Sequence, residues 1–154
     1  MKIKNNKIDW TMEGISLVML VGMTLFLIIN WKKIPDQVPM HYDWAGNIDR
    51  WGSKNELFLL PIMDWGMYLL ISGFECFPKI WNTGVSVTEE NVGRVYRALK
   101  YMMKSLKVIV ILDFLVMTLC AAMSLPLPGW FLPVFLILTF GDIIFWIVQL
   151  VRVK

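Results

Sequence analysis

Four long apolar runs divide the chain, and the segments between them differ sharply in polarity. Each run is close to the ~20 residues that a helix needs to cross ~30 Å of hydrocarbon. The pattern predicts four transmembrane helices, with a polar and aromatic loop over residues 32–56 between the first two. The runs cover residues 14–31, 57–77, 108–127 and 130–151.

Composition supports this interpretation, because 57% of the residues are hydrophobic and 18% are charged, against roughly 45–50% and about 25% in soluble domains. A soluble bundle of this length would have to bury four helices that are apolar on every side. We therefore predict an all-α membrane protein that forms a single four-span domain over residues 1–154. Lys2, Lys4 and Lys7 precede the first run and no small-residue cleavage site follows it, so we expect this run to remain as the first helix.

The basic residues predict the orientation in the membrane. Of fifteen, eleven lie before the first run, between the second and third, or after the fourth, whereas four lie in residues 32–56. The positive-inside rule then predicts that both termini are cytoplasmic and that loop 32–56 faces outward. The net charge of +3 is accounted for by this orientation, so the lipid bilayer is the expected partner and nucleic acid is not.

The loop over residues 32–56 holds the candidate binding residues. The two halves of the loop can pair as a hairpin around Gly46-Asn47, a dipeptide typical of two-residue turns, which would place Asp43 opposite Arg50 and Tyr42 opposite Trp51. A longer turn over residues 45–48 is the alternative. The candidate residues combine turn formers, charges and aromatic rings, namely Pro39, His41, Tyr42, Asp43, Gly46, Asp49, Arg50, Trp51, Gly52 and Lys54.

The residues of the loop do not indicate an enzymatic activity. His41 has Asp43 and Asp49 as orienting groups and Ser53 as a conceivable nucleophile, but no strand–Ser–helix elbow accompanies them. His41 either fixes the loop or forms part of a binding surface, and Tyr42, Trp44 and Trp51 are expected to pack the loop onto the helix ends. One histidine and two distant cysteines do not make a zinc site, so no metal or cofactor is predicted.

A basic helical extension is predicted over residues 88–107, on the cytoplasmic side. Thr88 can cap this helix, with Glu89 and Glu90 in its first turn. Its basic residues either bind anionic lipid or dock a cytoplasmic regulator.

Four carboxylates fall within the apolar runs, with no basic residue in those runs to pair with them. A charge at the bilayer centre costs about 2.5–3.5 kcal/mol, so these acids should face the bundle interior. Asp113 and Asp142 could approach each other across the third and fourth runs, as a proton or cation site or as a packing pair. The other two are Asp64 and Glu75, of which Glu75 is near enough to the cytoplasmic end to be solvated. Gly14, Gly22, Gly66 and Gly73 would permit close helix contact in a homo-oligomer.

The loop also carries a family resemblance. Trp31, residues 34–39, His41-Tyr42 and residues 45–54 are similar to the uncharacterised membrane domain at the front of bacterial SdpI-type immunity proteins. The resemblance covers residues 15–76. It implies a bacterial cytoplasmic membrane protein and protection against a secreted peptide toxin, a role in which such proteins also signal to a cytoplasmic repressor.

Together these patterns predict a non-enzymatic membrane protein whose external loop recognises an extracellular peptide toxin or an envelope lipid, in immunity or sensing. The alternative is a small transporter or transporter-like subunit that uses the intramembrane acids Asp64, Asp113 and Asp142.

Overall fold

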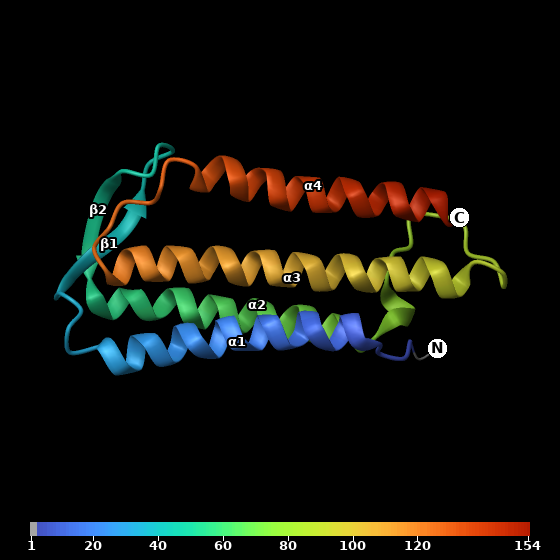
Figure 1. Cartoon of the computed structure of the whole chain (residues 1–154), viewed down its shortest axis with the longest axis horizontal. Coiled ribbons are helices and arrows are strands. Elements are labelled where there is room, and N and C mark those ends of the chain that lie inside the picture. The colour runs from blue at the N-terminus through green and yellow to red at the C-terminus, as the bar shows by residue number, and fades with distance from the viewer. Residues whose placement is uncertain (1–2) are drawn as a thin grey trace.

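The computed structural model describes residues 3–154 and contains four long helices and one β-hairpin (Figure 1). The hairpin lies between the first two helices, as the sequence predicts. Short 3₁₀ helices precede and follow the second long helix, at Lys54–Phe58 (η1) and Pro78–Ile80 (η2). The main elements are α1 (Lys7–Asn30), β1 (Gln37–Tyr42), β2 (Ile48–Ser53), α2 (Leu59–Glu75), α3 (Val92–Ala122) and α4 (Phe131–Arg152).

The four helices run side by side, and α3 is central to their packing. Helices α1, α2 and α4 each pack against α3. Both chain termini lie at one end of the bundle and the hairpin lies across the other end (Figure 1). We call these the termini end and the hairpin end.

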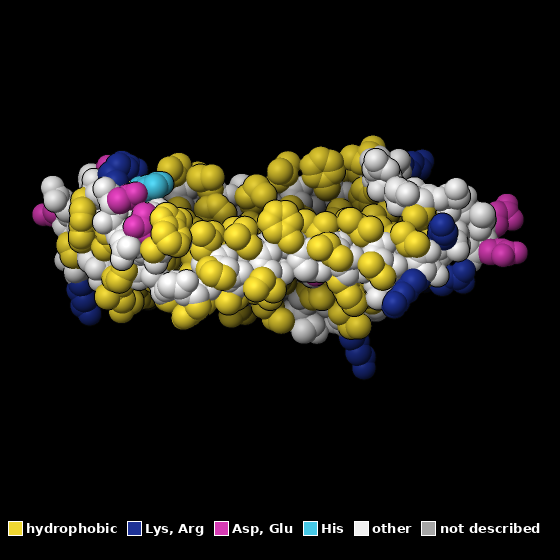
Figure 2. All heavy atoms as spheres, turned by 90° about the horizontal axis from the view of Figure 1, so that it is seen from above, with side chains coloured by type: hydrophobic (Ala, Val, Ile, Leu, Met, Phe, Trp, Pro, Cys, Tyr) yellow, Lys and Arg dark blue, Asp and Glu magenta, His cyan; other side chains and the backbone are white. Residues whose placement is uncertain are grey.

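The helices have the length and composition of membrane spans. Four segments meet both criteria: Lys7–Asn30, Lys54–Glu75, Val92–Ala122 and Phe131–Arg152. On the face drawn in Figure 2, apolar side chains cover the middle of the molecule and charged side chains gather toward its two ends. Exposed apolar surface of this extent suits lipid rather than water. The chain therefore has the architecture of a multi-pass membrane protein, and the prediction of four spanning helices is confirmed.

Helix α1 begins at Lys7, seven residues before the first apolar run. A capping box fixes this start: the Asn6 side chain accepts a hydrogen bond from the Asp9 amide at 3.0 Å, and Asp9 accepts one from the Asn6 amide at 2.8 Å. The first turns of α1 therefore carry Asp9 and Glu13 into the bundle.

Helix α3 continues without a break from Val92 to Ala122, so the predicted extension over residues 88–107 and the third apolar run share one helix. Its N-cap is Asn91 rather than Thr88. The Asn91 side chain accepts a hydrogen bond from the Thr88 amide at 2.7 Å, and the Thr88 hydroxyl accepts one from the Asn91 amide at 3.3 Å. Glu89 and Glu90 consequently lie in the turn before the helix.

The hairpin register differs from the prediction. Tyr42 pairs with Ile48 and His41 with Arg50, whereas Trp51 lies opposite Pro39. The two strands are joined by residues 43–47 rather than by a two-residue turn, so Asp43 does not face Arg50. This longer turn is close to the alternative that the sequence left open, and its pairing is irregular around His41.

Apolar residues at the base of the hairpin hold it on the helices. Val38 and Ile34 form a buried cluster with Leu57 and with Leu27 of α1, and the same cluster includes two alanines of α3, Ala121 and Ala122. The expectation that Trp44 and Trp51 do this packing is wrong, because Trp44 is 84% exposed and Trp51 is 50% exposed.

Candidate functional site

The turn of the hairpin is organised by Asp43. Its carboxylate accepts hydrogen bonds from the amides of Ala45 and Asn47 at 2.9 and 2.8 Å, and from the Asn47 side chain at 3.0 Å. These donors, with the Asn47 side chain foremost, lower the pKa of Asp43 below its usual value. Asp43 is therefore a turn-forming residue, and its partners are local.

Gly46 joins the turn to the connection between α3 and α4. Its φ of +89° lies in the region that favours glycine. Its carbonyl accepts a hydrogen bond from the Leu127 amide at 2.9 Å. A Cβ at this position would collide with the Leu127 carbonyl. The close approach of two backbones, as well as the positive φ, therefore requires glycine.

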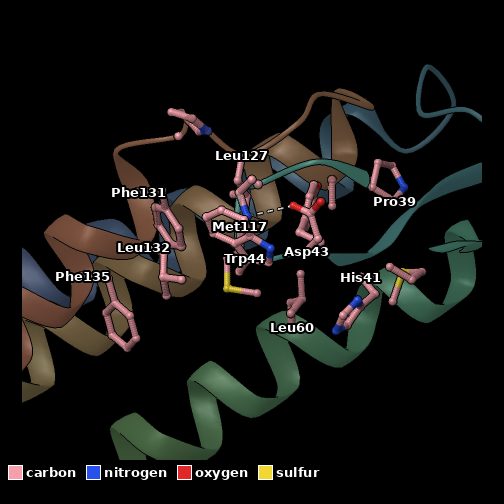
Figure 3. A pocket seen from close by; sticks show the side chains of 17 residues that line it. Pro39, His41, Asp43, Trp44, Leu60, Met117, Leu127, Phe131, Leu132 and Phe135 are labelled. Carbon is pink, nitrogen blue, oxygen red and sulfur yellow. Dashed lines mark hydrogen bonds between the residues drawn. The ribbon is translucent and has the colours of Figure 1, made fainter. Parts of the chain in front are cut away.

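Beneath the hairpin lies a mostly apolar pocket of about 340 Å³. Its roof is formed by residues 39–46, and its walls come from the hairpin ends of α2, α3 and α4, including Leu60, Met117 and Leu132 (Figure 3). We call this the hairpin pocket. Its volume is at the lower end of the ~300–1,000 Å³ typical of small-molecule sites.

Polar side chains extend from both strands of the hairpin. Nδ1 of His41 lies 2.6 Å from Oδ1 of Asp49, and both side chains are exposed. Asp49, rather than Asp43, is therefore the residue that orients the histidine. Arg50 makes a separate contact, with its guanidinium 3.6 Å from the Glu56 carboxylate.

Tyr42 connects the roof to the segment between α3 and α4. Its hydroxyl donates a hydrogen bond to the Leu125 carbonyl at 3.2 Å. Burial, together with the nearby Cys120 thiol, raises the pKa of Tyr42 to about 12. The phenol therefore stays protonated and remains a donor at physiological pH.

Lys54 secures the base of the hairpin. Its ammonium lies 2.7 Å from Asp36 and 5.6 Å from the centre of the Trp31 ring. The hydrogen bond from Lys54 lowers the pKa of Asp36. Lys54 thus has a structural role at the base of the hairpin.

The structure divides the ten predicted loop residues into two groups. Pro39, His41, Tyr42, Asp43 and Gly46 line the hairpin pocket. The remaining five do not line it: Asp49, Arg50, Trp51, Gly52 and Lys54. The pocket walls on α3 and α4 were not identified from the sequence, because single apolar residues of a spanning helix carry no signal that separates pocket lining from lipid contact.

The intramembrane acids do not form the expected pair. Asp142 accepts hydrogen bonds from the Ser105 hydroxyl at 2.9 Å and from the Trp146 indole at 3.1 Å. Ser105 and Asp113 are eight residues apart on α3, about 12 Å along the helix axis. Asp64 is fully buried, and within residues 3–154 neither of its carboxylate oxygens has a hydrogen-bond partner.

At the termini end, charged residues form a buried ionic cluster that the sequence analysis missed. Lys104 contacts Glu13 at 2.7 Å and Glu75 at 2.9 Å, and Lys107 contacts the same two acids, each at 2.9 Å. Glu75 is therefore paired rather than merely solvated. The full cluster consists of Asp9, Glu13, Glu75, Arg97, Lys100, Lys104 and Lys107.

A sequence signal for this cluster exists. Asp9 and Glu13 are four residues apart, as are Lys100 and Lys104, so each pair shares one helix face. Adjacent spans run in opposite directions, so the first and third spans run in the same direction. Both pairs lie near the start of their span and therefore at the same end of the bundle. Lys100, Lys104 and Lys107 accordingly point into the bundle and are nearly inaccessible, so the expectation that they form an exposed surface for lipid or a regulator is wrong.

Comparison with known proteins gives a match over the hairpin region. Residues 18–63 match a domain of unknown function (DUF1648). This segment contains the second half of α1, the hairpin and the start of α2. It includes the hairpin roof but excludes α3 and α4.

A relative from Archaeoglobus fulgidus, named only as an uncharacterized protein, is 32% identical over 47 residues. The aligned part makes up 30% of this chain and 26% of the relative. No solved structure matches the chain.

Proposed function

We propose that the hairpin pocket recognises an extracellular peptide or envelope component and that the protein acts in immunity or sensing. The observation that supports this best is that five of the ten candidate binding residues of the loop line one mostly apolar cavity. An apolar cavity beneath a polar roof suits an amphipathic ligand, whose apolar part enters while its polar part meets His41 and Asp49.

The proposal includes the orientation expected from the basic residues, with both termini in the cytoplasm of a bacterial cell and the hairpin outside. It also rests on the resemblance of residues 15–76 to the membrane domain of SdpI-type immunity proteins. The matched domain of unknown function covers much of the same region and is consistent with a shared membrane module.

The test is protection of a toxin-sensitive bacterium. Cells that express the chain are exposed to the sporulation-delaying peptide toxin, and survival is compared with empty-vector cells. We expect protection by the wild-type chain and at least a tenfold loss of survival with His41→Ala. If His41→Ala protected as well as the wild-type chain, His41 would not be part of the binding surface.

A pocket-filling variant tests the cavity itself. Leu132→Trp places a large side chain where α4 lines the hairpin pocket, whereas Leu136 lies one turn further along α4 and does not line it. We expect Leu132→Trp to abolish protection and Leu136→Trp to retain it, with equal membrane levels of both. Protection by both variants would contradict a role for the pocket.

Asp64 favours a second candidate function, a transporter or transporter-like subunit. A fully buried carboxylate without a hydrogen-bond partner among residues 3–154 is costly as an anion and marks proton or ion pathways in membrane proteins. Reconstituted protein should then show pH-dependent ion flux that Asp64→Asn abolishes. Asp142→Asn is the matched control, because Asp142 already has two donors. Absence of flux in the wild type excludes this candidate.

A further inference from the structure

A second cavity, of about 910 Å³, lies at the termini end. It is bounded by the start of α1 and the segment before it, by the end of α2 and the segment after it, and by α3. Trp10 and Trp81 contribute aromatic rings, and the charged lining consists of three bases, Lys4, Lys100 and Lys104, and three acids, Asp9, Glu13 and Glu75. The cavity is at the opposite end of the bundle from the hairpin pocket, so its ligand is independent of the function proposed above.

The ionic cluster beside this cavity has unequal numbers of charges. Glu13 and Glu75 are matched by Lys104 and Lys107, which leaves a single acid, Asp9, for two bases. In total the cluster has four bases and three acids, a formal charge of +1.

The surplus positive charge is located at Lys100. Arg97 has the close contact with Asp9, at 2.9 Å, whereas Lys100 is 3.8 Å away. The hydrogen bonds of Lys100 go to neutral oxygens, the Ile3 carbonyl and the Asn5 side chain. Its side chain is only 5% exposed and it lines the cavity. A buried cation with a weak counter-ion is costly, and an anion in the cavity would offset that cost.

We propose that this cavity binds a phosphate group, with Lys100 as the principal counter-ion and Lys4 at the rim. Each of the three acids in the wall has a base within 2.9 Å of one of its oxygens, which offsets its repulsion of a phosphate group. The tryptophan rings suit the depth of lipid headgroups. The phosphate belongs either to an anionic phospholipid or to a free phosphate ion, because both present the same oxygens to an ammonium.

The experiment measures thermal unfolding of the detergent-solubilised full chain. It is titrated separately with phosphatidylglycerol, with phosphatidylcholine, and with inorganic phosphate against chloride at equal ionic strength. We expect phosphatidylglycerol or inorganic phosphate to raise the unfolding temperature in a saturable way. Stabilisation by the lipid alone assigns the site to a headgroup, and stabilisation by inorganic phosphate assigns it to the free ion.

Variants locate the site. Lys100→Gln should weaken the apparent affinity at least fivefold, while Lys79→Gln, an exposed base at the same end that does not line the cavity, should leave it unchanged. Because Lys100 is buried, Lys4→Gln provides a second measurement at an exposed position and should weaken the affinity about twofold. Equal stabilisation by phosphatidylcholine, or unchanged affinity in the folded Lys100 and Lys4 variants, would overturn the proposal.

Discussion

At the scale of single residues, Gly46 and Gly52 show how one residue type meets different demands. Gly46 combines a positive φ with the close approach of Leu127. Gly52 does not have a positive φ, but an added Cβ would lie 2.7 Å from Met40 Cγ and from a Glu56 oxygen. The sequence suggests that both are turn glycines, yet only the folded contacts distinguish backbone strain from crowding.

We expect Gly46→Ala to lower the free energy of unfolding by about 1–3 kcal/mol, because alanine meets both strain and a collision. Thermal unfolding in detergent measures this change. Gly14→Ala is the matched control, since nothing lies within 4 Å of a Cβ there and alanine is the better helix former. Equal stability of the two variants would show that the turn is not held as described.

Asp43 makes the turn sensitive to strong acid. Hydrogen bonds lower the pKa of Asp43 in the folded chain. Its contribution to the stability of the turn is therefore complete above the usual aspartate pKa of about 3.9 and is lost as the pH falls through the lower pKa of the folded state. We expect the amides of Ala45 and Asn47 to keep their hydrogen-exchange protection at pH 5–7 and to lose it in stronger acid. Asp43→Asn should remove this acid-dependent loss of protection. If the loss persisted in the variant, a group other than Asp43 would be responsible for it.

At the scale of elements, α3 shows what hydrophobic periodicity does and does not predict. The apolar positions and their length are sufficient to predict a helix and its membrane span. They do not reveal that Lys100, Lys104 and Lys107 turn inward, because a basic residue near a helix end is usually solvated. That orientation depends on partners from α1 and α2, which are distant in sequence. The hairpin register differs from the prediction for another reason: local hydrogen bonds from Ala45 and Asn47 to Asp43 shape the turn, rather than a charge pair between Asp43 and Arg50.

The ionic cluster should be sensitive to the loss of one base. We expect Lys107→Met to lower the free energy of unfolding by about 3–5 kcal/mol, because Glu13 and Glu75 would share one remaining lysine. Adding Glu75→Gln to Lys107→Met should recover part of this loss, since the local charges then balance again.

Unfolding in mixed detergent micelles measures both variants. Lys79→Met serves as control, because Lys79 is exposed at the same end and should change stability by less than about 0.5 kcal/mol. If Lys107→Met were as stable as wild type, the buried contacts would not contribute to the fold.

At the scale of the whole molecule, the common position of the termini and the opposite position of the hairpin give the orientation a direct test. A thiol reagent that cannot cross the membrane should label Ala45→Cys in intact cells and should not label Glu90→Cys, both in a background without Cys76 and Cys120. Both positions are exposed in the structure, whereas Asn91 is buried by its capping role and would report burial instead. The reverse labelling pattern would invert the orientation.

The packing of α4 has a mechanical consequence. Among the described residues this helix rests chiefly on α3, whereas α1, α2 and α3 are fastened together by the ionic cluster. Phe131, Leu132 and Phe135 of α4 nevertheless form one wall of the hairpin pocket. A small tilt of α4 about α3 would therefore widen or narrow the pocket without separating any ion pair of the cluster. Ion pairs thus join α1, α2 and α3, whereas α4 forms one wall of the hairpin pocket without taking part in the ionic cluster.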